Sequence, residues 1–127
     1  MGKFVRFGLA GLMAAGILAS APHAFARGGI ITTGPCSVAA KWKLTLSADN
    51  PGKIQVEFEV DEGTPGSTWK VRLKDNGIGF FKGQAVMDSF GSFTVTKFAT
   101  DQAGTDNILA QAKNVATGET CQGTGSI

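Results

Sequence analysis

The sequence has little of what most enzymes use to move protons. It contains one histidine, His23, no tyrosine, and two cysteines that lie far apart in the chain. Histidine is the side chain that most often serves as the base beside a serine or cysteine nucleophile. Because His23 stands in an N-terminal segment that we expect to be removed, a serine–histidine hydrolase is excluded.

The chain also lacks an apolar run long enough for a membrane anchor, since such a helix needs roughly 20 apolar residues. The shorter run over residues 8–19 follows Lys3 and Arg6, and Ala24 and Ala26 stand at the two positions that a signal peptidase recognises. This order is typical of a cleavable signal peptide. We therefore expect residues 1–26 to be removed, no membrane span after cleavage, and a protein that is secreted or lies in the periplasm or cell envelope.

A net charge is lacking as well once that segment is gone. The whole chain has 12 basic and 10 acidic residues, and two of the basic ones, Lys3 and Arg6, belong to the predicted signal peptide. The remainder is formally neutral, so the positive field expected of a general nucleic-acid or anionic-membrane binder is absent. We predict no nucleic-acid partner.

Cys36 and Cys121 are the only cysteines, and they lie near the two ends of the chain that remains. An even number of cysteines in an oxidising compartment predicts a disulfide. Such a bond would be worth about 4–5 kcal/mol in the chain-entropy model. The alternative, free or metal-bound thiols, has no further cysteine to support it.

Alternating apolar and polar residues dominate the rest of the chain, which is typical of strands with one buried face. About seven short strands in about ninety residues indicate a two-sheet antiparallel β-sandwich. The predicted class is therefore all-β, with a flexible lead-in over 27–35, a single domain over 36–123 and a loose tail over 124–127. The expected strands lie at 38–47, 53–60, 69–74, 78–84, 92–98, from 108, and 119–123.

The first two expected strands join through a turn at residues 49–52. An antiparallel register with Leu46 opposite Ile54 keeps both apolar sets on one face and places Lys43 opposite Glu57. Core pattern and charge pairing then agree, and we predict this register.

The order of features resembles immunoglobulin-like and fibronectin type III-like sandwiches. Trp69 stands where strand C of such domains keeps its core tryptophan, residues 101–106 resemble the Asp-x-Ala-Gly corner between strands E and F, and residues 108–121 look like the F–G hairpin. The chain also resembles small secreted bacterial proteins of this plan with no established activity.

Two departures from that pattern limit what the resemblance implies. The corner tyrosine is absent, with Asp106 near its place, and the cysteines would join the first strand region to the last. The resemblance therefore implies a sandwich of this general type, and the fold alone implies no function.

Carboxylate pairs are the remaining candidates for catalysis or metal binding. Asp61-Glu62 and the pair Asp101 and Asp106 lie in turn-like loops, where aspartate usually bonds its own backbone. Calcium prefers such oxygen ligands, and Asp101 and Asp106 could share a site with Asp61 or Glu62. No Asp-x-Asp-x-Asp-Gly run supports a calcium loop, so we favour a hydrogen-bonded corner and predict no enzyme, cofactor or metal.

A row of basic residues is the strongest sign of a binding surface. Lys70, Arg72 and Lys74 occupy outward positions of one strand, and Lys113 is expected beside them. The Asn-Gly pair at 76–77 predicts a tight hairpin that places Phe81 across from Arg72 on the same face. Exposed aromatics ringed by charge mark partner sites. A solvated lysine face with an arginine stacked on Phe81 is the alternative.

These features predict an exported, non-enzymatic binding module that recognises an extracellular or envelope macromolecule through the basic and aromatic face. We expect it to be a monomer. One alternative is a structural or accessory envelope protein without a specific ligand. Another is an inhibitor of an extracellular enzyme, acting through a loop such as residues 61–67.

Overall fold

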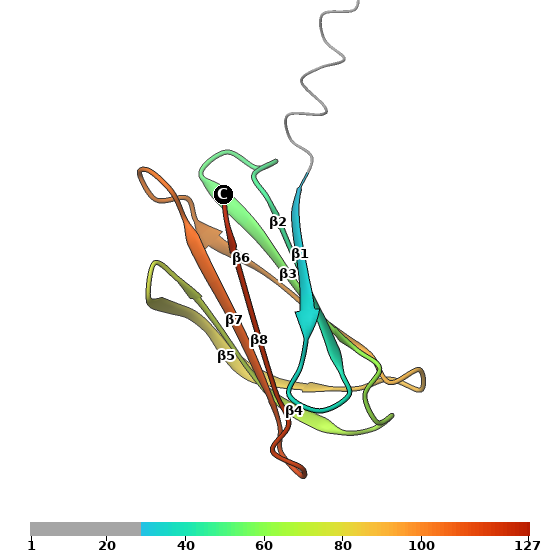
Figure 1. Cartoon of the computed structure of the whole chain (residues 1–127). Coiled ribbons are helices and arrows are strands. Elements are labelled where there is room, and N and C mark those ends of the chain that lie inside the picture. The colour runs from blue at the N-terminus through green and yellow to red at the C-terminus, as the bar shows by residue number, and fades with distance from the viewer. Residues whose placement is uncertain (1–28) are drawn as a thin grey trace, which may run out of the picture.

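The computed structural model describes residues 29–127, and every regular element in this range is a β-strand (Figure 1). The predicted signal peptide, residues 1–26, lies outside the described residues. No helix in the described part is long and apolar enough to cross a membrane. The eight strands are β1 (Ile30–Pro35), β2 (Lys41–Ser47), β3 (Lys53–Asp61), β4 (Thr68–Asp75), β5 (Ile78–Val86), β6 (Phe93–Thr100), β7 (Asn107–Asn114) and β8 (Thr120–Ser126).

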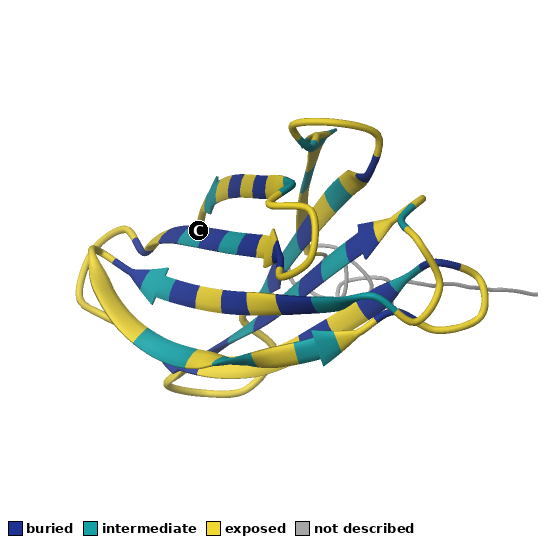
Figure 2. Ribbon diagram, turned by 90° about the horizontal axis from the view of Figure 1, so that it is seen from below, coloured by how far each residue is buried: buried dark blue, intermediate teal, exposed yellow. Residues whose placement is uncertain are grey.

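The strands form two antiparallel four-stranded sheets that pack face to face. One sheet has the order β1-β2-β3-β6, and the other has the order β5-β4-β7-β8. Buried and exposed residues alternate along most strands, as the banding in Figure 2 shows. The predicted all-β two-sheet sandwich is confirmed, with one strand more than the sequence suggested.

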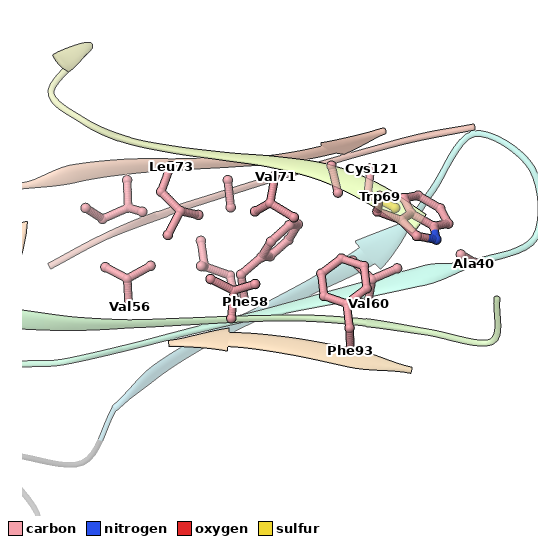
Figure 3. Close-up of a cluster of buried hydrophobic side chains, with 14 of the residues drawn as sticks. Ala40, Val56, Phe58, Val60, Trp69, Val71, Leu73, Phe93 and Cys121 are labelled. Carbon is pink, nitrogen blue, oxygen red and sulfur yellow. The ribbon is translucent and has the colours of Figure 1, made fainter. Parts of the chain in front are cut away.

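The core consists of the inward residues of both sheets, which interdigitate between them (Figure 3). Trp69 and Phe58 are the largest fully buried side chains, and Phe93 packs near Trp69 with ring centroids 6.0 Å apart. The predicted inward positions of β3 and β4 are all buried: Ile54, Val56, Phe58, Val60, Trp69, Val71 and Leu73. Two aromatic residues lie outside this core, since Phe90 is 87% exposed and Phe98 is 49% exposed.

The segment predicted as a flexible lead-in, 27–35, instead contains an edge strand. β1 pairs with β2 along its whole length, from Ile30 opposite Leu46 to Pro35 opposite Lys41. Its glycine and proline suggested a loop, but an edge strand tolerates proline. A Cβ at Gly34 would lie 2.7 Å from the ring of Trp42, so glycine is required where this tryptophan packs against β1.

The tail predicted to be loose, 124–127, is also ordered. β8 continues to Ser126, and the backbones of Ile127 and Asp106 then exchange two hydrogen bonds of 2.9 and 3.0 Å. The Thr32 hydroxyl donates to the Thr124 carbonyl at 2.9 Å, which links β1 to β8 between the sheets. The folded unit therefore extends beyond the predicted limits of 36–123 at both ends.

The predicted register of β2 against β3 is wrong by two residues. Leu46 lies opposite Val56, and Lys43 lies opposite Glu59. A shift of two residues leaves every side chain on its expected face, which is why the core pattern could not detect it. Charge pairing still holds, because Lys43 Nζ lies 3.6 Å from Glu59 Oε1.

The predicted disulfide between Cys36 and Cys121 is confirmed. It joins the loop after β1 to β8, and therefore one sheet to the other. Beside it, the Glu119 carboxylate accepts the N–H groups of residues 38–40 at 3.2, 2.8 and 2.8 Å. These bonds hold residues 38–40 outside the sheet, so the strand predicted over 38–47 begins at Lys41, and Val38 is 77% exposed.

Candidate binding surface

The outer face of the β5-β4-β7-β8 sheet carries basic residues and no carboxylate. Outward positions on its strands hold five cations, which we call the cationic face: Lys70, Arg72, Lys74, Lys82 and Lys113. Asp75, at the end of β4, is the single acidic residue in these four strands, and it is buried. The predicted basic surface is therefore present in the fold, with a composition that differs in part from the prediction.

The strand pairing brings like charges directly opposite one another. Arg72 lies opposite Lys82 on β5, and Lys70 lies opposite Lys113 on β7. Like charges at opposed positions destabilise a sheet. Among the described residues, none of these four side chains makes a salt bridge. The surface thus holds concentrated positive charge without an internal counterion.

A shallow groove of about 700 Å³ runs across this face, over the row of opposed residues that contains Arg72 and the row that contains Lys70. Its rim includes the four opposed cations and the glutamines 84, 111 and 122. Gln111 Nε2 donates to Gln122 Oε1 at 3.1 Å, which leaves the remaining amide hydrogens and the Gln111 oxygen available to a ligand. The groove can therefore offer positive charge together with amide donors and acceptors.

The sequence predicted that Phe81 lies across from Arg72, and the structure shows that this prediction is wrong. The register between β4 and β5 shifts between Leu73 and Lys74, so Phe81 lies opposite Leu73 and Lys82 takes the place beside Arg72. One extra residue on one strand of a pair is a β-bulge, and it moves all later side chains to the other face. The turn itself is as predicted, since Asn76 and Gly77 have φ of 49° and 84°.

Phe81 packs at the open side of the sandwich, between β5 and β6. It is half-buried against the core, and a Cβ at Gly83 would lie 2.7 Å from its ring. Lys97 of β6 occupies an inward position opposite Val56, and its ammonium lies 4.6 Å from the Phe81 ring centroid. This distance permits a cation–π interaction. Phe81 therefore belongs to the edge of the core. Together with Phe80 it lines a smaller hollow beside Arg72 and Lys82, and neither ring lines the groove.

Lys74 and Lys113 differ in their relation to the groove. Lys113 lines it next to Lys70, as expected. Lys74 lies on the same face beside Leu109, is half-buried, and stands outside the groove. Lys82 is the binding candidate that the sequence prediction missed. The alternation of Lys82 and Gln84 with Phe81 and Gly83 was the pattern that could have identified it.

The corner formed by Asp101 and Asp106 is hydrogen-bonded, which is the arrangement that the sequence favoured over a calcium site. Asp106 is 1% exposed, and both its carboxylate oxygens accept the Gln102 N–H at 3.2 Å. Asp101 is exposed, and its interaction with Asp106 raises its pKa. Residues 29–127 contain no group of three or more potential ligands that could hold a metal ion.

Asp75 is a third carboxylate at this corner, which the sequence did not indicate. It is 6% exposed, and neither of its oxygens has a hydrogen-bond partner. Burial raises its pKa to about 6, with further contributions from the adjacent Asp106 and from Asp101. Below this pKa, a proton on Asp75 supplies an O–H that Asp106 can accept, which relieves the repulsion between the two buried carboxylates.

The loop considered for enzyme inhibition, residues 61–67, is fastened to the loop that follows β5. Gly63 N–H donates to the Gly91 carbonyl at 3.0 Å, and Gly66 N–H donates to the Met87 carbonyl at 2.9 Å. Lys41 Nζ lies 3.2 Å from Glu62 Oε1, so one acid of this loop is already paired.

No protein-family model matches the chain, and no curated protein is significantly similar to it.

Proposed function

We propose that the protein is an exported, non-enzymatic binding module that recognises an anionic macromolecule of the cell envelope or extracellular space through the cationic face. The observation that carries this proposal is the opposition of Arg72 to Lys82 and of Lys70 to Lys113 without an acidic partner. Functional sites are among the places where natural sequences depart from such local rules, and this departure supports a binding role for the surface.

The neutrality of the chain after residue 26 strengthens this interpretation. Basic and acidic residues are then equal in number. The cationic face therefore results from an uneven distribution of charge over the domain and not from an excess of basic residues. A local concentration of one sign steers an oppositely charged partner to that face. The disulfide between Cys36 and Cys121 supports an oxidising location for this encounter.

We also propose that the domain is of the immunoglobulin-like or fibronectin type III-like kind, similar in plan to small secreted bacterial proteins with no established activity. If β4 is equated with strand C, the pairings β3–β6, β4–β7 and β7–β8 correspond to B–E, C–F and F–G. Trp69, fully buried on β4, then has the place of the core tryptophan. In such domains an outer sheet face is a frequent docking surface.

Binding of the fluorescently labelled protein to washed cell envelopes of its source organism tests the proposal. Replacing Lys70, Arg72 and Lys82 by glutamine together should abolish this binding, because it removes three charges from the groove. A matched variant with Lys41, Lys43 and Lys53 replaced by glutamine has the same net charge and should bind as the wild type does. Equal binding by both folded variants would show that the cationic face has no role and would favour a structural module.

A further inference from the structure

We infer that the ligand of the cationic face is an acidic polysaccharide, a chain that carries carboxylate or sulfate groups together with many hydroxyls. This inference rests on the function proposed above, because it names the chemistry of the partner for the same surface. It is carried by three properties of the groove: the spacing of its charges, its amide side chains and the absence of aromatic residues from its lining.

The charges are arranged for a repeating anion. Lys70 and Arg72 are two positions apart on β4, a separation of roughly 7 Å, and neighbouring strands lie about 4.8 Å apart. Lys82 and Lys113 extend these two rows in opposite directions across the sheet. A single small anion would engage one or two of these side chains. A polymer with anionic groups along its length can engage all four.

The glutamines supply what a charged surface alone does not. Gln84 lies opposite Lys70, Gln111 lies opposite Arg72, and Gln122 lies opposite Gln111, so each row of cations contains at least one amide. An amide both donates and accepts hydrogen bonds and therefore fits a hydroxyl, which does the same. Arg72 adds a planar fork suited to carboxylate or sulfate. Mixed rows of cations and amides match a polymer that alternates anions with hydroxyls.

No aromatic side chain lines the groove, although Phe80 and Phe81 line a smaller hollow beside Arg72 and Lys82. Protein–protein sites depend on a few buried aromatic or aliphatic side chains, and single-stranded nucleic acid requires aromatic stacking platforms. The bulge in β5 turns Phe81 toward the core side, and no aromatic residue lines the groove. Its volume of about 700 Å³ lies within the range of sites for ligands as large as a few sugar units. These observations favour a glycan over a protein or a nucleic acid.

Titration calorimetry with the disulfide-bonded protein tests the inference. Four probes separate the chemistries: alginate oligomers carry carboxylates and hydroxyls, polyglutamate carries carboxylates alone, dextran carries hydroxyls alone, and duplex DNA carries phosphates. We expect alginate to bind most tightly and dextran not to bind. The triple glutamine variant at Lys70, Arg72 and Lys82 should lose roughly 100-fold in alginate affinity, about fivefold per lost contact. The matched variant at Lys41, Lys43 and Lys53 should keep its affinity.

A second variant separates hydroxyl recognition from charge. Replacing Gln84, Gln111 and Gln122 by alanine should weaken alginate binding about tenfold and leave the dependence of affinity on salt concentration unchanged, since no charge is lost. Polyglutamate or DNA binding as tightly as alginate, or no effect of these alanines, would overturn the glycan inference.

The envelope experiment distinguishes the two proposals. Binding that requires the cationic face but is destroyed by protease treatment of the envelopes, and is not competed by alginate, would retain the proposed function and overturn the glycan. Binding that survives protease and is competed by alginate supports both. Binding that does not depend on the cationic face overturns both.

Discussion

The two outer faces of the sandwich differ in which charges lie opposite one another on neighbouring strands. On the β1-β2-β3-β6 sheet, Lys43 lies opposite Glu59 and Lys41 lies opposite Asp61, so cations alternate with carboxylates across the strands. On the β5-β4-β7-β8 sheet, cations lie opposite cations, as Arg72 does opposite Lys82. One face therefore contains opposed pairs of unlike charge, and the other contains opposed pairs of like charge.

The two arrangements of charge differ in what they contribute to the stability of the sheets. Each opposed pair of unlike charges stabilises a sheet by a few tenths of a kcal/mol, and each opposed pair of like charges destabilises it by a similar amount. Because both faces belong to the same small domain, composition and compartment are common to both. The difference between them is therefore specific to the cationic face.

The largest effect that would disturb both faces is loss of the bond that ties the sheets together. Replacing Cys36 and Cys121 by alanine should lower the free energy of unfolding by about 4–5 kcal/mol, because the bond closes a long loop of the unfolded chain. Urea denaturation followed by tryptophan fluorescence measures this. If the double variant unfolds at the wild-type urea concentration, strand pairing alone holds the two faces in place.

The next effect concerns Asp75, the one carboxylate in the strands of the β5-β4-β7-β8 sheet, which points inward. The pKa of Asp75 is about 6 in the folded protein against an ordinary 3.8, so the folded state retains a proton that the unfolded chain releases between these values. The contribution of Asp75 to stability is greatest below about pH 4 and is lost as the pH rises to about 6. Asp75→Asn should therefore raise stability at pH 7 by about 2 kcal/mol and flatten this pH dependence.

Asp49→Asn is the matched control, since it removes the same charge from an exposed turn. It should change neither the stability nor its pH profile by more than about 0.5 kcal/mol. Thermal unfolding between pH 4 and 7 compares the three proteins. A loss of stability in Asp75→Asn at neutral pH would show that the buried carboxylate is needed in its charged form.

The smallest effect tests the comparison of the faces directly. Lys82→Glu places a carboxylate opposite Arg72 and should stabilise the fold by about 0.5 kcal/mol, whereas Lys43→Glu opposes Glu59 and should destabilise it by a similar amount. Denaturant midpoints measure both changes. Lys82→Glu should also weaken envelope binding, so that stability and function move in opposite directions. Destabilisation by both variants would remove the argument that the cationic face carries a cost.

Most of the fold follows from periodicity. Alternation over Ile54 to Val60 and over Trp69 to Leu73 is enough to assign those strands and their buried faces, because the side-chain period of a strand leaves no choice. The edge strand β1 escaped prediction because Gly34 and Pro35 are loop residues by composition. Gly34 leaves room for the ring of Trp42, and this contact between segments is not contained in the local pattern.

The candidate site was predictable only as far as the strands were regular. Lys70, Arg72 and Lys113 lie where alternation placed them. The bulge near Leu73 then exchanged Phe81 for Lys82, and a bulge is a property of the paired strands together. Asp75 was missed for a related reason, since its neighbour Asp106 comes from a distant turn.

Lys97 has a consequence beyond its contact with Phe81. β6 is an edge strand, and edge strands offer unpaired backbone groups to which other chains can add. An incoming strand on β6 would bury the ammonium that now covers the Phe81 ring at the open side of the sandwich. A charge in an inward position makes that addition costly. Lys97 therefore protects the β6 edge of the first sheet against strand addition by another copy of the protein.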